Sequence, residues 1–177
     1  MTHHVSFVPP TAFRGRPFDY TDTHLTPFGP ALVVACGHDI VFWGFCSQIE
    51  AGRVRDAVQQ KWQPASLRAA PQAVNALAEN ARAAPAHLAL AGTSFQHRVW
   101  QKLLDIPQGQ TSSYKQLADA LHSAPRAIGG AVGANPVSLL VPCHRVLAAD
   151  KTLNGYRWGL EVKARILAAE GVAFKNT

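Results

Sequence analysis

The residues with the clearest chemical potential are Cys143 and His144, which are adjacent in the segment Pro142-Cys-His-Arg-Val146. A thiol is a nucleophile only as its thiolate, and a neighbouring histidine can accept its proton. Apolar sequence on both sides predicts that the thiol is held in one place. The alternative is a small core residue, because free cysteine is among the most buried residue types. The pair alone favours that alternative, so the surrounding elements must decide.

Three predicted helices precede this pair. Residues 93–104 begin with a capping-box pattern and continue as an amphipathic helix. Residues 113–121 form a shorter amphipathic helix, and residues 126–134 restart a helix that Asn135 and the following proline end. A helix, a short break and a second helix are typical of helix-turn-helix proteins.

The second helix of this pair is unusual for a reader of the major groove. Residues 126–134 are almost entirely Ala, Gly, Ile and Val, with Arg126 alone at the start. A helix that reads bases there presents Arg, Asn or Gln to the base edges. Small residues let a helix backbone approach a narrow surface closely, such as a minor groove or another helix. The composition alone leaves DNA contact and tight packing equally open.

The N-terminal half predicts a small α/β domain. Residues 1–26 are polar and predict an irregular lead-in, and residues 31–36 and 40–46 predict a hairpin. Residues 52–84 predict an Ala-rich helical segment, and residues 83–92 predict a linker.

Length and composition limit the class of protein. A chain of 177 residues that is 47% hydrophobic is typical of one globular domain or two small ones. We predict a lead-in at 1–26, an N-terminal domain at 27–90 and a C-terminal domain at 91–177. No apolar run has membrane-spanning length, and the start lacks a signal-peptide pattern.

Three cysteines do not make a disulfide framework, so a cytoplasmic localisation is expected. Cys36 and Cys46 fall in predicted strands and are interpreted as packing residues, because no ligand spacing supports a metal site. Charge is concentrated in the second half, where residues 92–177 carry 10 Lys and Arg against 5 Asp and Glu. A basic half favours a polyanionic partner such as nucleic acid.

Together, the C-terminal motifs resemble the O6-alkylguanine-DNA alkyltransferase family. Six segments carry the resemblance, in the family's order and spacing: residues 93–100, 106–118, 126–136, 141–146, 154–160 and 163–171. The resemblance implies an α+β fold. A small ribonuclease-H-like sheet domain would be followed by a mostly helical, winged-helix-like domain that contains the helix-turn-helix.

The resemblance also implies direct-reversal DNA repair. The O6-alkyl group of guanine would be transferred irreversibly to Cys143, once per molecule, with no cofactor and no catalytic metal. Glu170, His144 and a water would form the hydrogen-bonded chain that draws the thiol proton away. Tyr114 would donate a hydrogen bond to the departing base, and Arg145 is interpreted as a structural partner.

The implied partner is double-stranded DNA containing O6-alkylguanine, bound through the minor groove without sequence specificity by a monomer. Base flipping and DNA contact would fall on Arg126, Ala127, Gly130 and Ala134. The substrate pocket and its support would comprise Asn135, Pro142, Val146, Tyr156, Arg157 and Trp158. The last two are bulky where many members carry small residues, which is expected to narrow the pocket.

Three other functions compete with this interpretation. A non-catalytic lesion-binding protein of the same architecture would lack a cysteine in the position of Cys143. A helix-turn-helix regulator would need base-reading side chains on residues 126–134. A cysteine hydrolase would need direct contact between Cys143 and His144, which is awkward because adjacent strand residues point to opposite faces.

Overall fold

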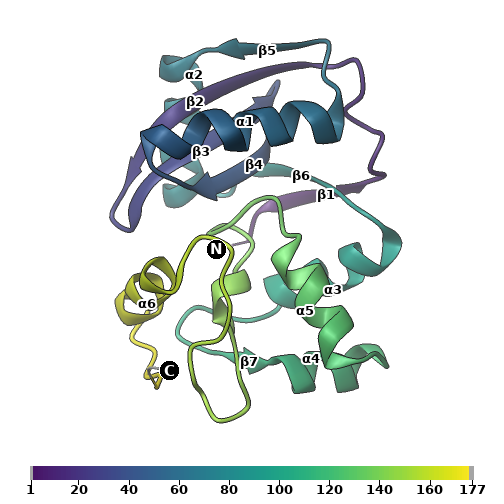
Figure 1. Ribbon diagram of the computed structural model, residues 1–177, viewed down its shortest axis with the longest axis vertical. Helices are drawn as coiled ribbons and strands as arrows, with labels where there is room; N and C mark the ends of the chain where they lie inside the picture. The colour runs from purple at the N-terminus through teal and green to yellow at the C-terminus, as the bar shows by residue number, and fades with distance from the viewer. Residues whose placement is uncertain (1, 176–177) are drawn as a thin grey trace. The chain divides into compact units, whose positions relative to one another are not determined.

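The computed structural model describes residues 2–175 and divides into two compact units between Thr93 and Ser94. Within the described part of the first unit, six strands form one mixed sheet in the order β1-β6-β4-β3-β2-β5 (Figure 1). The strands are β1 (His4–Val8), β2 (Pro17–Thr26), β3 (Gly29–Cys36), β4 (Asp39–Phe45), β5 (Ser66–Ala69) and β6 (His87–Ala91). The antiparallel pairing of β3 with β4 confirms the predicted hairpin.

Helices α1 (Gln48–Trp62) and α2 (Pro71–Ala83) cover opposite faces of this sheet. Phe42 of β4 makes an edge contact with Trp62 of α1, whereas the next residue, Trp43, meets His24 of β2. Nδ1 of His24 in turn lies 3.2 Å from Oδ1 of Asn75 on α2. Since adjacent strand residues point to opposite faces, each helix packs on its own side. This explains why β3 and β4 are apolar at nearly every position.

The prediction of an irregular lead-in at residues 1–26 is wrong, because this segment contains β1 and β2. Phe13 and Phe18 are 2% and 1% exposed and belong to the core. The polar residues of β2 made this strand resemble a loop in the sequence. Arg55 of α1 donates to Asp22 over 2.8 Å, so a distant partner satisfies a side chain that reads locally as a loop residue.

Two further predictions in this unit are wrong. The helical segment at 52–84 is interrupted by β5, because Gln63 adopts a left-handed conformation (φ 46°) and ends α1. The linker at 83–92 contains β6, which lies between β1 and β4. Its short apolar run is that of a buried parallel strand, a pattern that periodicity alone does not distinguish from other apolar segments.

The second unit holds three helices that match the predicted ones to within one or two residues. Its elements are α3 (Ser94–Leu104), β7 (Ser112–Ser113), α4 (Tyr114–Leu121), α5 (Pro125–Gly133), a 3-10 turn η1 (Cys143–Arg145), β8 (Val146–Leu147) and α6 (Leu160–Ala169). Ser113 begins α4 with a capping box: its hydroxyl accepts from the Gln116 amide, and the Gln116 side chain accepts from the Ser113 amide. None of the helices within residues 2–175 is long and apolar enough to cross a membrane.

Helix α5 is held against α3 by its apolar side. The indole nitrogen of Trp100 donates to the carbonyl of Ala131 over 2.8 Å, and Ile128 is fully buried. The opposite side of α5 leaves Arg126 and Ala127 exposed. The small residues therefore serve tight packing on one side and leave a smooth surface on the other.

The corrected N-terminal fold predicts that Phe13 is a core residue. Phe13→Ala should destabilise the protein by about 3–5 kcal/mol, the usual range for removing a buried phenylalanine. Leu25→Ala, at a residue 74% exposed, should change stability by less than about 0.5 kcal/mol. Urea unfolding followed by tryptophan fluorescence measures both, and equal small effects would restore the lead-in interpretation.

Candidate active site

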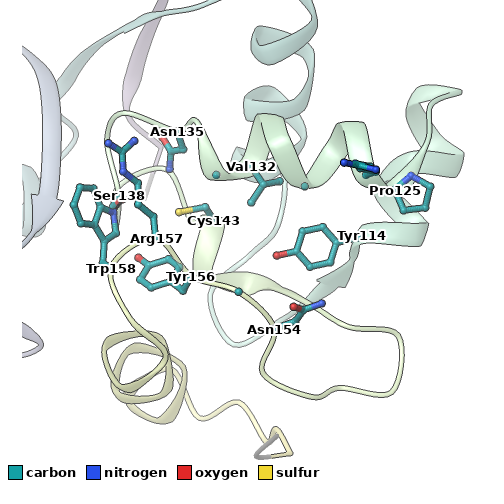
Figure 2. Close-up of a pocket in the computed structure, with 14 residues that line it drawn as sticks. Tyr114, Pro125, Val132, Asn135, Ser138, Cys143, Asn154, Tyr156, Arg157 and Trp158 are labelled. Atoms are coloured by element: carbon teal, nitrogen blue, oxygen red, sulfur yellow. Dashed lines mark hydrogen bonds between the residues drawn. The ribbon is translucent and has the colours of Figure 1, made fainter. Parts of the chain in front are cut away.

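A cavity of about 650 Å³ lies in the second unit, with Cys143 at its wall (Figure 2). Seven of the predicted site residues line it: Tyr114, Arg126, Asn135, Cys143, Tyr156, Arg157 and Trp158. Seven others were not predicted: Pro125, Gly129, Val132, Gly133, Ser138, Asn154 and Gly155. The cavity therefore draws on α4, α5, the segment that follows α5, η1 and the loop before α6.

Cys143 is the first residue of η1 and is 5% exposed. This corrects the expectation that Cys143 and His144 lie in a strand. Burial raises the pKa of the Cys143 thiol, while the neighbouring side-chain donors of Asn135, Ser138 and Tyr156 act in the opposite direction. With the pKa raised on balance, the resting group is a thiol, and a nucleophilic sulfur requires a base.

Asn135 fixes the approach of the chain to the thiol. Its Nδ2 donates to the carbonyl of Val141 over 2.9 Å, and its Oδ1 accepts from the amide of Val137 over 3.0 Å. The side chain is buried and bridges the two ends of the segment that separates α5 from η1. Pro142, which is also buried, then places Cys143 at the start of the turn.

His144, the residue after Cys143, forms a largely buried pair with Glu170. Nε2 of His144 lies 3.2 Å from Oε1 of Glu170, which follows the end of α6. Burial lowers the pKa of His144, despite the raising effect of the carboxylate, so the imidazole is neutral at physiological pH. Because a carboxylate only accepts, we assign the imidazole proton to Nε2, which leaves the lone pair on Nδ1.

Nδ1 of His144 is buried and has no hydrogen-bond partner among residues 2–175. A buried polar atom of this kind is normally satisfied by protein or water. Its lone pair is thus available to accept a proton.

Arg145 holds the carboxylate of Glu170 in place. Its Nε and Nη2 donate to the two carboxylate oxygens over 2.9 and 2.6 Å, and its Nη1 donates to the carbonyl of Ile106 over 2.6 Å. Burial alone would raise the pKa of Glu170, but the hydrogen bonds from His144 and Arg145, together with the charge of Arg145, lower it to about 2. Glu170 is therefore ionised, and Arg145 has the structural contacts that its sequence position suggested.

Two tyrosines face the cavity with protonated hydroxyls. Burial raises the pKa of Tyr114, and burial together with Cys143 raises the pKa of Tyr156 well above its ordinary value. In Figure 2 the hydroxyl of Tyr114 points into the cavity from α4, and Tyr156 lies on the side of the sulfur. Both phenols can donate hydrogen bonds to a bound molecule.

Lys163 is an important residue to which the sequence analysis assigned no role. It is completely buried, and Nζ donates over 2.7 Å to the carbonyls of both Val146 and Asn154. Burial lowers the pKa of Lys163 to about 8. A signal existed, since Lys163 stands three and four residues before the apolar Ile166 and Leu167 on one face of α6.

The remaining predicted residues do not line the cavity. Ala127 and Gly130 are exposed on α5, Ala134 is partly exposed at its end, and Val146 is buried. Cys36 and Cys46 are buried in the first unit, and no three His, Cys, Asp or Glu side chains gather as a metal site within residues 2–175.

Comparison with known proteins agrees with this site. Residues 94–172 match the family described as 6-O-methylguanine DNA methyltransferase, DNA binding domain. A methylated-DNA–protein-cysteine methyltransferase of Candida albicans is 49% identical over 83 residues, which cover 47% of this chain and 47% of that protein. The matched stretch thus spans about half the length of that relative.

Solved structures extend the similarity to both units. The crystal structure of a Mycobacterium tuberculosis O6-methylguanine methyltransferase is 32% identical, covers 86% of this chain and 91% of that chain, and has a TM-score of 0.67. A second structure from that organism, described as OGT in complex with DNA, is 30% identical over 87% of this chain and 92% of that one, with a TM-score of 0.67. The chain belongs to the O6-methylguanine methyltransferase family, which confirms the resemblance noted in its sequence.

The carboxylate of Glu170 should contribute strongly to stability. Because its pKa is lowered from 4.5 to about 2, its contribution is present above pH 4.5 and is lost as the pH falls toward 2. Glu170→Gln should therefore cost about 2–3 kcal/mol at pH 7, where it leaves Arg145 without a buried counter-charge. The difference in unfolding free energy between Glu170→Gln and the unchanged protein should shrink as the pH falls from 4.5 toward 2.

Urea unfolding of both proteins at several pH values measures this difference. Asp119→Asn is the matched control, because its pair with Lys115 is 65–71% exposed and should contribute about 0.5 kcal/mol or less. A Glu170→Gln penalty as small as that of the control would mean that the carboxylate is not structurally required.

Proposed function

We propose that this protein repairs alkylated DNA by direct reversal, transferring the O6-methyl group of guanine irreversibly to Cys143. The observation that carries the proposal is a buried thiol that faces a 650 Å³ cavity and is backed by the His144–Glu170 pair, in a chain of this family. The cavity is large enough for one nucleobase, as sites for small ligands measure roughly 300–1,000 Å³. No cofactor is needed for a single displacement.

Proton removal follows from the tautomer of His144. The proton on Nε2 stays hydrogen-bonded to the Glu170 carboxylate. Nδ1 therefore accepts the thiol proton, through a water placed between it and Cys143. The sulfur then attacks the methyl carbon as the bond from that carbon to O6 breaks. In balance, the methyl group replaces the thiol proton and guanine gains one proton. The thioether is stable, so each molecule acts once.

Tyr114 and the pocket residues would serve the departing base. The raised pKa of Tyr114 keeps its phenol protonated, and its hydroxyl can donate to guanine as negative charge develops there. One such donor contributes on the order of 3 kcal/mol to the transition state. Asn135, Pro142 and Val146 support the turn, and Tyr156, Arg157 and Trp158 form the wall that receives the base.

The partner would be double-stranded DNA, entered from the minor groove without sequence specificity. A relative of 30% identity is described in complex with DNA. The exposed side of α5, with Ala127 and Gly130, is smooth enough for close approach to a narrow groove, with Ala134 near its end. Arg126 borders the cavity and would fill the space left by the extruded nucleotide.

The finer description of the fold belongs to this proposal too. The mixed sheet of the first unit with its two helices supports a ribonuclease-H-like domain. The α3–α5 helices with the short β7–β8 pair support a winged-helix-like domain. We propose a protein that acts as a monomer in the cytoplasm.

The decisive experiment is the intact mass of the protein after mixing with a duplex that carries one O6-methylguanine. A gain of one methylene on the peptide containing Cys143, with loss of the lesion, is expected. Cys143→Ser should bind the duplex and gain no mass, whereas Cys46→Ser should react as the unchanged protein does. Binding without mass gain would instead indicate a lesion-binding protein. The absence of both binding and transfer would overturn the proposal.

Arg126 should matter only when a base must leave a duplex. Arg126→Ala should slow methyl transfer from duplex DNA by roughly 10–100-fold, since extrusion costs a few kcal/mol. Transfer from a single-stranded oligonucleotide should slow much less. Single-turnover rates on the two substrates measure the contrast, and Arg165→Ala, at an exposed arginine of α6, is the control. Equal slowing on both substrates would argue against a role in extrusion.

A further inference from the structure

A short hydrogen bond beside the thiol is not explained by the chemistry above. Nε1 of Trp158 donates to Oγ of Ser138 over 2.5 Å. Ser138 is 1% exposed, so its hydroxyl is cut off from bulk water. Both residues line the cavity with Cys143, and Figure 2 shows the sulfur directed toward the side where they lie.

The direction of this bond constrains the serine hydroxyl. An indole N–H only donates, so Oγ of Ser138 must be the acceptor. The hydroxyl has a single proton, which must then point away from the indole. Hydrogen bonding by the Ser138 side chain lowers the pKa of both the Cys143 thiol and the Tyr156 phenol, so the sulfur and the phenol oxygen are the two candidate acceptors of this proton. A thiolate is the stronger acceptor of the two once it forms. Trp158 thus leaves the hydroxyl in an orientation that can donate to sulfur.

We propose that Trp158 and Ser138 form a positioning pair for the nucleophile, in which the indole orients the Ser138 hydroxyl to donate a hydrogen bond to the sulfur of Cys143 as the thiolate forms. The inference rests on the proposed function only in that Cys143 is the nucleophile of that reaction. Trp158 acts through Ser138 and is not itself a catalytic residue.

The energetic reason is the burial of the sulfur. A thiolate in a site shielded from water is costly unless donors surround it, and a hydrogen bond to a charged acceptor is about twice as strong as a neutral one. Asn135 and Tyr156 also face the sulfur, and Asn135 has one Nδ2 hydrogen committed to the Val141 carbonyl. Because the Ser138 oxygen already accepts from Trp158, the serine proton remains available as an additional donor to the sulfur.

A purely structural role is the competing explanation. The same bond joins the segment after α5 to the loop before α6, so it could simply hold the cavity wall together. That role and ours differ in one measurable respect. Loss of a support would slow every reaction of Cys143 at all pH values, whereas loss of a donor to the thiolate would move the pH at which the thiol ionises.

The test is the rate of Cys143 alkylation by iodoacetamide across pH, with peptide mapping to separate it from Cys36 and Cys46. Ser138→Ala should raise the midpoint of the profile by about one pH unit, which is roughly tenfold slower reaction below the midpoint. Trp158→Phe keeps the serine but removes the indole donor, and should raise the midpoint by less than Ser138→Ala does. Ser66→Ala, at an exposed serine of β5, should leave the profile unchanged.

Methyl transfer from the O6-methylguanine duplex is measured on the same proteins. If the unchanged protein transfers no methyl group, the proposed function fails, while the midpoint comparison still decides the role of Ser138. If it transfers the group but Ser138→Ala has an unshifted midpoint, the positioning pair is overturned. Slower reaction of both variants with no shift in midpoint would overturn it in favour of a structural support.

Discussion

Burial of the Cys143 thiol is the constraint on which the rest of the second unit depends. In the proposed reaction a shielded sulfur would attack the alkyl carbon of a bound base away from bulk water, but burial raises the pKa of the thiol and so opposes formation of the nucleophile. The neighbouring side chains offset that cost in two ways. Donors from Asn135, Ser138 and Tyr156 face the sulfur, and the neutral imidazole of His144 keeps a free lone pair nearby.

These groups come from distant parts of the chain, and buried charges hold the parts together. Arg145 of the 3-10 turn binds both the carboxylate after α6 and the carbonyl of Ile106 after α3. Lys163 of α6 binds carbonyls on both the strand after the turn and the loop at Asn154. Removing one partner of such a contact is costly, because it leaves a buried charge uncompensated. The intact contacts hold one geometry, which the proposed one-step displacement needs.

The two sides of α5 differ, although small residues make up most of the helix. Ile128 packs inward and the Ala131 carbonyl accepts from Trp100, so the helix is firmly placed despite its glycines. Its other side carries little more than a backbone and Arg126. From the sequence, packing and DNA contact looked like alternatives. The structure shows that packing uses one side of the helix, which leaves the other side open for the proposed contact with DNA.

The sequence by itself determined helices α3, α4 and α5 and half of the residues that line the cavity, because prolines and helical periodicity are local signals and the family motifs are nearly continuous. It failed for β1, β5 and β6, whose strand partners are far away in the chain, and for β2, whose polar side chains pair with distant residues such as Arg55. It also assigned no role to Lys163 or Ser138. Their importance depends on which carbonyl, indole or sulfur lies beside them, and only tertiary packing decides that.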